Sequence, residues 1–433
     1  MIQIKRNNIN VLAKRHYKDF FEKRGFLEKL KKIEANESDV LKKRFFKYLL
    51  DNIEDVIMGN PKCLSRLLKD MIRRNKYIAS RIINRKIVEE QLKKQNDREK
   101  KLIKNQKNLL EKESDETELS DVYNKILKVK FKKQCMNDEI KEGKQLHKEI
   151  KKIFNYNLFT GIYEKDKKNR NKSKGRSKDK GRSKDKGRSK DKGKSKDKGD
   201  RWDAYELVKN LRIEVCPYCN RQFTTTVEPV KGEKGRTRPE LDHFYSQSQY
   251  PFFAVSFFNL IPCCHICNSN LKGSKEFDVN THLHPYENGL DDLVEFTVKF
   301  NEKIDDIDYV NALLHNPQVL TIDFKINAVK KQKYKRSDLK SLLYKINNNK
   351  RVFKLKTLYN AHTDYVGEII LKSLLYNNDR IEYMYKDFPN LFSKKEDLAR
   401  LVYSNHVDAE NMDKRVLAKL TKDIVKEFGI KYI

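Results

Sequence analysis

The apolar residues of the first 160 positions recur at the spacing of amphipathic helices, which predicts helices that pack through one face. One such set is Val11, Phe20, Phe21, Leu27, Leu30 and Ile33. Ser38 is a suitable N-cap for a following helix, and Pro61 suits the first turn of the next one. Neither glycine nor proline interrupts 76–112. We therefore expect one long helix there, followed by a second from about 119 to 154 that forms a helical hairpin with it.

The second half of the chain has helical patterns at both ends and alternating patterns between them. Residues 202–211 predict a short helix, whereas 293–300 and 319–326 alternate apolar and polar positions as strands do. Helical spacing returns from residue 337. We therefore expect an α+β fold, in which a mainly α-helical chain carries a small cysteine-rich module with a few strands after it.

A repeated hexapeptide, Gly-Arg-Ser-Lys-Asp-Lys, fills most of the segment between residues 171 and 200. A segment without apolar residues has nothing to bury, so we expect disorder here. Its function is either to contact phosphates as a basic tether or only to act as a spacer. The predicted domains are a basic helical domain (1–165), a linker (166–200), a cysteine-rich module (201–290) and a mainly helical C-terminal domain (291–433).

The net charge of the chain is +33, from 95 lysines and arginines against 62 aspartates and glutamates. Residues 1–170 contribute +19, residues 171–200 contribute +9, and the remaining residues only +5. An excess of this size predicts a polyanionic partner, most often DNA, held mainly by the first 200 residues. The alternative is a lysine-rich composition that only keeps the protein soluble.

Hydropathy argues against a membrane protein and against secretion. The mean hydropathy is −0.85, and no apolar run approaches the roughly 20 residues that a membrane-spanning helix needs. The first residues lack the apolar core of a signal peptide. We therefore expect a cytoplasmic protein with no membrane partner. Seven cysteines in a chain of 433 residues are also too few for a disulfide framework.

Two Cys-x-x-Cys motifs, Cys216-x-x-Cys219 and Cys264-x-x-Cys267, are the strongest chemical signal in the sequence. Two such knuckles can supply four thiolates to a tetrahedral, structural Zn²⁺. The alternatives are two unpaired redox motifs or a chance arrangement. Because the 44 residues between the knuckles exceed the usual loop of a zinc ribbon, we expect a further folded element between them.

Residues suited to phosphodiester chemistry lie between and beside the knuckles. Asp242 precedes His243, Asn259 begins the run Asn-Leu-Ile-Pro, and Asn268 directly follows the last cysteine. A histidine can activate water, and carboxylate and amide oxygens suit Mg²⁺. Phosphodiester cleavage needs both a nucleophile and a cation at the leaving oxygen. For an isolated Asp-His pair, a histidine of the protein core is the plainer interpretation.

This series of motifs resembles the HNH endonucleases, which are ββα-metal nucleases whose zinc knuckles brace a β-hairpin and a helix. The resemblance covers about 213–275. It implies that His243 is the general base, that Asp242 binds the catalytic cation (Mg²⁺ or Mn²⁺), and that Asn259 orients His243. Asn268 stands where the family usually has its last histidine, as a weaker ligand for that cation. The family's products carry a 5′-phosphate and a 3′-hydroxyl.

Other polar residues near the motifs have two interpretations each. The cations that flank them are Arg236, Arg238 and Lys272. Each is either a phosphate contact or an ordinary solvated side chain. Three further histidines are His282, His284 and His362. One of them could reach the scissile phosphate, but a hydrogen-bonded or surface histidine is the commoner case.

The wider order of a helical flank, zinc knuckles and a helical tail resembles HNH proteins of anti-phage defence islands, such as the nuclease subunit of Septu-type systems. Those nucleases work beside an ATPase partner. The function expected from these resemblances is a metal-dependent DNA endonuclease of anti-phage defence with an ATPase partner. RNA is also a compatible substrate, because the metal chemistry does not distinguish the sugars. The alternative is a non-catalytic, zinc-containing subunit that binds nucleic acid or acts as a scaffold.

Overall fold

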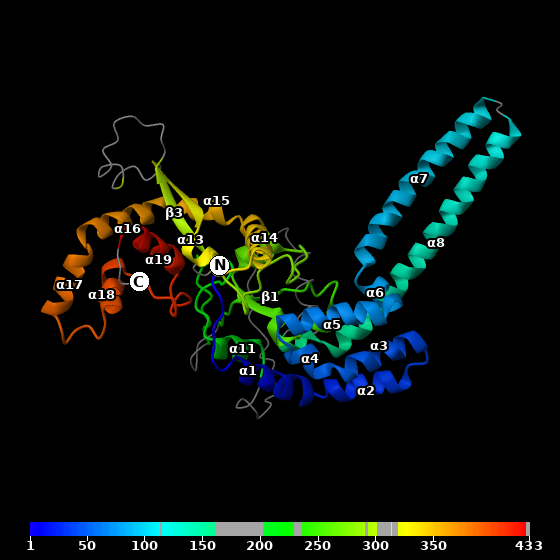
Figure 1. The fold of residues 1–433 in the computed structure, drawn as a ribbon. Coiled ribbons are helices and arrows are strands. Elements are labelled where there is room, and N and C mark those ends of the chain that lie inside the picture. Colours follow the sequence, from blue (N-terminus) through cyan, green and yellow to red (C-terminus); the bar gives the residue numbers. More distant parts are fainter. Residues whose placement is uncertain are drawn as a thin grey trace, which may run out of the picture. The chain divides into compact units, whose positions relative to one another are not determined.

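The computed structural model describes residues 1–112, 115–161, 202–228, 235–290, 293–300, 313 and 319–429. The predicted linker, 166–200, lies outside the described residues. Within them the chain is mainly helical and has two antiparallel pairs of strands (Figure 1), which confirms the expected α+β class. None of the described helices is both long and apolar enough to cross a lipid bilayer.

The chain divides into two compact units, and each unit joins segments that are distant in the sequence. Unit 1 consists of Met1–Ala13, Trp202–Phe244 and Phe258–Ile433, and unit 2 of Lys14–Arg201 and Tyr245–Phe257. These boundaries differ from the predicted domains, because the first residues of the chain group with its second half. Backbone hydrogen bonds explain this grouping: the amide of Ile2 donates to the carbonyl of Pro217 (2.9 Å), and that of Ile4 to Pro285 (2.8 Å).

Unit 2 is built from helices that follow one another along the chain after α1 (Ile9–Arg15). They are η1 (His16–Glu22), α2 (Phe26–Asn36), α3 (Val40–Asp51), α4 (Ile53–Met58), α5 (Pro61–Arg74), α6 (Lys76–Ile82), α7 (Arg85–Glu111), α8 (Glu116–Ile153), α9 (Tyr156–Phe159) and the short η2 (Pro251–Phe253). As predicted, α5 begins at Pro61. The prediction of Ser38 as a cap is wrong: the Asp39 carboxylate accepts from the amides of Leu41 and Lys42, both at 2.9 Å.

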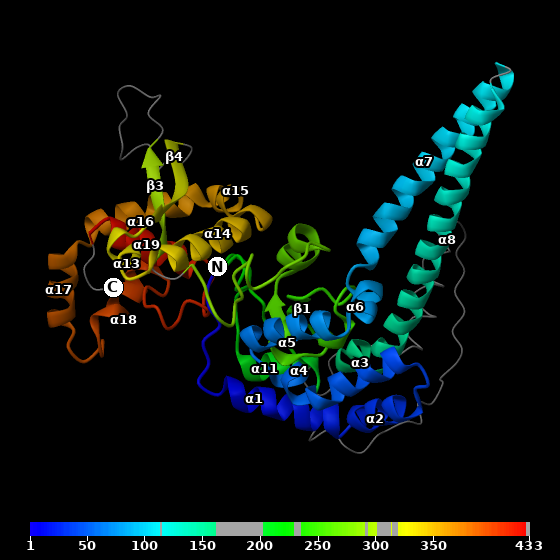
Figure 2. The same ribbon diagram turned by 45° about the vertical axis from the view of Figure 1, so that its right-hand side comes forward.

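The predicted helical hairpin is present, but its first arm is divided. A break at Ile83 and Asn84 separates α6 from α7, and α7 then lies along α8 (Figures 1 and 2). The buried side chains of α8 fall on the face toward its partner helices and include Val122, Ile126 and Ile140. The hairpin is thus held by a narrow apolar seam between two strongly charged helices.

Aromatic side chains form the centre of unit 2. The fully buried set includes Phe20, Phe21, Phe45, Phe46, Phe154 and Phe159. His16 is also fully buried among these rings, and its Nε2 donates to the Val255 carbonyl at 2.7 Å. Burial lowers the pKa of His16 to about 4, so this histidine is a neutral part of the core at neutral pH.

Unit 1 contains both strand pairs and the C-terminal helices. Its elements are α11 (Ala204–Leu211), β1 (Glu240–His243), η3 (Phe257–Asn259, which begins at the boundary), β2 (Leu260–Cys263), η4 (Ile266–Lys272), β3 (Val294–Phe300), β4 (Leu320–Ile326), α13 (Ala328–Lys331), α14 (Arg336–Val352), α15 (Leu355–Tyr359), η6 (Asn360–His362), α16 (Thr363–Leu375), α17 (Asn378–Asp387), α18 (Lys395–Tyr403) and α19 (Ala418–Glu427). The helix α11 and the strands β3 and β4 confirm the short helix and the two strands that the sequence predicted.

The β3–β4 pair anchors the C-terminal helices of unit 1. The two strands pair along their whole length, from Val294 opposite Ile326 to Phe300 opposite Leu320. The buried carboxylate of Asp423 on α19 accepts from the amide of Phe296 at 2.8 Å. This hydrogen bond ties the last helix to the strand pair.

Candidate functional site

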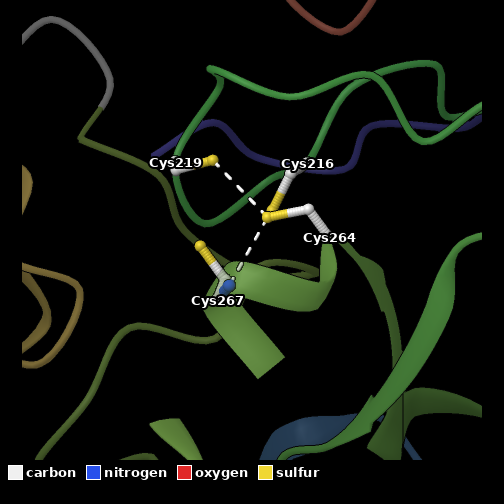
Figure 3. Close-up of side chains that lie close together, drawn as sticks. All are labelled: Cys216, Cys219, Cys264 and Cys267. Atoms are coloured by element: carbon white, nitrogen blue, oxygen red, sulfur yellow. Dashed lines mark hydrogen bonds between the residues drawn. The ribbon is translucent and has the colours of Figure 1, made fainter. Parts of the chain in front are cut away.

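The two Cys-x-x-Cys motifs meet in unit 1 and form one cluster of four sulfurs (Figure 3). The sulfurs of Cys216, Cys219, Cys264 and Cys267 all lie within 4.8 Å of one another, and those of Cys219 and Cys264 are 3.9 Å apart. Tetrahedral Zn²⁺ with bonds of about 2.3 Å to sulfur places its ligands roughly 3.8 Å apart. The cluster therefore fits a structural zinc ion, and a metal-binding site of this kind is what the knuckle spacing predicted.

Backbone amides and neighbouring thiols stabilise negative charge on Cys219 and Cys264, whereas burial raises the pKa of Cys216. The amide of Arg221 points at the Cys219 sulfur, and that of Cys267 at the Cys264 sulfur, both at 3.4 Å. Hydrogen bonds from the neighbouring thiols lower the pKa of Cys219. Such donors favour the thiolate form that a zinc ion requires.

Distant parts of unit 1 hold the first knuckle in place. The hydroxyl of Tyr359, at the end of α15, donates to the Cys219 carbonyl at 2.6 Å. Asn220 has a left-handed backbone (φ 51°), which asparagine tolerates better than most residues. Its carbonyl accepts from the Leu417 amide at 2.6 Å, and its side chain accepts from the Lys419 amide at 3.1 Å. The turn is therefore built together with the last helix of the chain.

Between the knuckles lies a short β-hairpin, followed by the helical segment η4. The strands β1 and β2 pair antiparallel, with Glu240 opposite Cys263 and His243 opposite Leu260. The second knuckle begins where β2 ends and leads directly into η4. Because side chains alternate along a strand, Glu240 and Asp242 share one face of β1, and His243 belongs to the other. The hydrogen bonds of Glu240 and Asp242 show that their face is the one toward η4.

Asp242 forms a buried ion pair with Lys272. The Lys272 ammonium donates to the Asp242 carboxylate at 2.7 Å and to the His243 carbonyl at 2.6 Å. The hydroxyl of Tyr218, between the first two cysteines, donates to the second oxygen of Asp242 at 2.6 Å. The two charged side chains are almost fully buried, with exposures of 2% for Lys272 and 3% for Asp242. Burial raises the pKa of Tyr218, so this hydroxyl stays protonated and remains a donor.

Asn268 does not face Asp242 but bonds to Glu240. Its amide donates to Glu240 Oε2 at 2.8 Å, next to the hydroxyl of Ser269 at 3.1 Å, and Nδ1 of His265 lies 2.6 Å from Oε1. Burial raises the pKa of Glu240, but these hydrogen bonds outweigh it and lower the pKa below its usual value. Glu240 is thus a carboxylate with three donors, and it is a site residue that the motifs did not single out. Its position two residues before Asp242 was the available signal.

In this arrangement the predicted cation ligands, Asp242 and Asn268, each have another partner. An ammonium already neutralises the carboxylate of Asp242, and the amide of Asn268 serves Glu240. A cation at Asp242 would have to displace Lys272. The predicted pair of cation ligands, Asp242 and Asn268, is therefore divided between two separate hydrogen-bond networks.

His243 and Asn259 lie together at the end of the hairpin where residues 244–259 connect its two strands. His243 ends β1, and Asn259 immediately precedes β2. The amide of Phe244 donates to the Asn259 carbonyl at 3.0 Å. His243 is half-buried, whereas Asn259 is fully buried. The structure thus places the predicted base and its predicted orienting residue on neighbouring backbone positions.

The three predicted phosphate contacts have different environments. Arg236 and Arg238 both lie over the ring of Tyr205, with 4.4 and 5.5 Å between guanidinium and ring centre. Arg238 also lines a cleft of about 330 Å³ whose wall includes Phe223 and His265. Lys272 differs because it is buried and paired, as described above. Of the three predicted phosphate contacts, only the two arginines are accessible cations, as a phosphate contact requires.

The three histidines for which the sequence left two interpretations, His282, His284 and His362, all contact other residues of unit 1. The ring of His282 stacks on Phe277 at 3.9 Å, and the buried ring of His284 packs against Phe244 at 4.2 Å. Burial lowers the pKa of His282 to about 4 and that of His284 to about 3. His362 accepts a hydrogen bond from Arg221 at 2.9 Å. All three contribute to packing or hydrogen bonding within unit 1.

Comparison with known proteins gives one partial match. A segment of 75 residues is 35% identical to protein ea31 of Escherichia phage lambda; it covers 17% of this chain and 21% of that protein. The chain therefore aligns with only about a fifth of the length of this relative. No family model matches the chain, and no solved structure matches it.

Proposed function

We propose that this protein is an HNH-type endonuclease that hydrolyses phosphodiester bonds in DNA. The observation that carries the proposal is a β-hairpin whose first strand ends at His243 and whose second strand leads into the helical segment η4. The four cysteine sulfurs cluster near the junction of that second strand with η4. This is the order of elements that the resemblance to ββα-metal nucleases implies.

In this proposal His243 takes a proton from the attacking water, whose oxygen forms a new bond to phosphorus. The bond from phosphorus to the 3′-oxygen breaks, and the leaving oxygen takes up a proton, so the products are a 5′-phosphate and a 3′-hydroxyl. Asn259 is the positioning residue for His243, since the two lie at the same end of the hairpin. Arg236 and Arg238 would contact the phosphates on either side, and RNA is a second substrate to test.

The proposed nuclease depends on Mg²⁺ or Mn²⁺, as the resemblance implies. The Asp242–Lys272 pair favours a second candidate, a non-catalytic zinc module that binds nucleic acid, because it leaves no free carboxylate at Asp242. The proposal also includes a role in anti-phage defence beside an ATPase partner. The order of motifs between helical flanks supports this role.

A cleavage assay on supercoiled plasmid tests the nuclease directly. Wild type, His243→Ala and His406→Ala would be compared with added Mg²⁺, with Mn²⁺ and without a divalent cation. His406 is the matched control because it is a half-buried histidine outside the hairpin. We expect metal-dependent nicking by wild type and the control, and a loss of at least about 100-fold in His243→Ala, since general-base catalysis contributes about 10²–10⁴-fold.

Two outcomes would redirect the proposal. Cutting by His243→Ala at the wild-type rate would remove His243 from the mechanism. If a folded, zinc-loaded wild type binds the plasmid but cuts it under no condition, the non-catalytic module becomes the better description. The assay would then be repeated with an ATPase partner.

A further inference from the structure

Unit 2 contains a cleft with basic walls, in a part of the chain where no motif was singled out. A cleft of about 240 Å³ opens where α3, the end of α5 and the start of α6 meet. Its basic side chains are Arg44, Arg73, Arg74 and Lys76. None of the described residues that line it is acidic. The cleft therefore concentrates positive charge in a concave surface.

Nearby carboxylates compensate only part of this charge. Asp70 pairs with Arg73 and Arg74, both at 2.8 Å. In the described part of the chain, no ion pair or hydrogen bond involves the side chain of Arg44 or Lys76. These two exposed cations are consequently available to an anion without breaking an existing pair.

Asn75, which joins α5 to α6, forms part of the cleft and is only 6% exposed. Its backbone is satisfied, because its amide donates to the Met71 carbonyl and its carbonyl accepts from Ala79, both at 2.9 Å. The side-chain nitrogen Nδ2 is different. It is buried and has no hydrogen-bond partner among the described residues.

A buried N–H donor without an acceptor is uncommon in folded proteins, because no hydrogen bond offsets the free-energy cost of removing it from water. The partner that completes such a site must be an acceptor. A negatively charged oxygen accepts a stronger hydrogen bond from the amide than a neutral oxygen does. It is also attracted by the cations on the surrounding walls.

We propose that this cleft binds a single phosphate group, with Asn75, Arg44 and Lys76 as its ligands. Phosphate carries more charge than a carboxylate and offers several acceptor oxygens, which matches a site with one amide and several cationic donors. The phosphate belongs either to a nucleic-acid backbone or to a free phosphate compound. The site is separate from the hairpin of unit 1, so it does not depend on nuclease activity.

The test uses the full-length, zinc-loaded protein without added divalent cations, so that no cleavage is measured. One arm follows inorganic phosphate and pyrophosphate by titration calorimetry at constant ionic strength. The other follows a fluorescent DNA duplex by anisotropy over a range of salt concentrations. The site variants are Asn75→Asp, which replaces the donor by a carboxylate of the same shape, and the double variant Arg44→Gln/Lys76→Gln.

The matched control is Lys62→Gln/Lys69→Gln, which removes the same charge from exposed positions of α5 outside the cleft. We expect both site variants to lose about tenfold or more in affinity for the probe that belongs to the site, and the control to change less than about twofold. Should Asn75→Asp fail to fold, the double variant of exposed residues still decides the question.

The two arms distinguish the source of the phosphate. Weaker duplex binding, with a salt slope reduced by about one for each phosphate that the protein no longer neutralises, identifies a nucleic-acid backbone. Loss of phosphate or pyrophosphate binding with unchanged duplex binding identifies a free phosphate compound. If the site variants bind both probes as the control does, the cleft holds only water and the proposal is wrong.

Discussion

The α7–α8 hairpin of unit 2 and the β-hairpin of unit 1 are both simple two-armed elements, but they are stabilised in opposite ways. The helical hairpin joins neighbouring parts of the chain through apolar side chains such as Val122 and Ile126. The β-hairpin has only four residues in each strand and relies on partners elsewhere in unit 1, among them the four-cysteine cluster and the buried Lys272.

This difference predicts how each region loses stability when its side chains are changed. A seam of apolar residues loses stability gradually, as its side chains are truncated one at a time. A short strand pair that buries charges and thiolates depends on every partner, because an uncompensated buried charge is costly. The predictions below test this contrast, beginning with the largest expected effect.

Loss of zinc should unfold the β-hairpin region and leave the helical hairpin intact. Structural zinc sites contribute apparent free energies of about 10–16 kcal/mol to folding. We therefore expect Cys267→Ser to lose zinc and to lose protection from hydrogen exchange across β1, β2 and η4. Mass spectrometry of exchange, together with metal analysis, measures both effects.

The control for this experiment is Cys135→Ser, an exposed cysteine on α8. It should retain zinc and wild-type protection. Equal loss of protection in α7 and α8 of the Cys267→Ser variant would contradict the contrast between the two regions.

Breaking the Asp242–Lys272 pair should have the next largest effect. Lys272→Met leaves a buried carboxylate without its cation, which typically costs about 3–5 kcal/mol in the free energy of unfolding. Asp242→Asn/Lys272→Met removes both charges and should recover part of this loss. Urea denaturation gives the values.

A surface pair provides the comparison. Lys299 lies 3.3 Å from Asp323 and is 65% exposed, so Lys299→Met should cost less than about 1 kcal/mol. A similar cost for the two lysine variants would show that the Asp242–Lys272 pair is not buried in solution.

In unit 2, the backbones of α6 and α8 approach each other closely. A Cβ atom on Gly143 of α8 would overlap the Arg81 carbonyl oxygen of α6. Gly143→Ala should therefore push the two helices apart and cost about 3 kcal/mol, despite the better helix propensity of alanine. Ser120→Ala, at an exposed position of the same helix, is the control for thermal unfolding. An unchanged melting temperature for Gly143→Ala would mean that α6 and α8 do not approach this closely.

Acid should weaken both units through their buried histidines. The folded pKa is lowered from 6.5 to about 4 for His16 in unit 2 and to about 3 for His284 in unit 1, in both cases by burial. Below pH 6.5 the unfolded chain binds more protons than the folded one, so stability is full above pH 6.5 and falls as the pH drops toward the folded pKa. Each histidine should cost about 2 kcal/mol between pH 7 and pH 5.

Hydrogen exchange at the two pH values, corrected for the intrinsic rates, tests this effect region by region. His16→Leu should reduce the pH dependence of unit 2, and the part that remains belongs to the buried His147, whose pKa burial also lowers to about 4. Phe20→Leu, a nearby core substitution without a titrating group, should lower stability equally at both pH values. An unchanged pH dependence in His16→Leu would contradict the assignment to His16.

Much of the architecture was predictable because helical and strand patterns depend on neighbouring residues and because metal-binding motifs have characteristic spacings. The spacing of Cys216, Cys219, Cys264 and Cys267 predicted a metal-binding cluster, and the alternating patterns predicted both strands of the β3–β4 pair. The preference of a residue type for the N-cap position led to one wrong prediction. Ser38 and Asp39 are both good caps, and only the packed helix shows that Asp39 serves.

The mainly helical class and the position of the helical hairpin followed from the sequence alone, since helical periodicity is a local property. The pairing of the knuckles also followed from it, because each Cys-x-x-Cys motif supplies half of a tetrahedral zinc site. Three contacts could be seen only in the folded chain: Lys272 neutralises Asp242, Asn268 donates to Glu240, and the first residues of the chain bond to the first knuckle and to Pro285. Those contacts join residues from 28 to more than 200 positions apart. The energy of a buried charge depends on which partners surround it in space, and that is decided only when the whole unit folds.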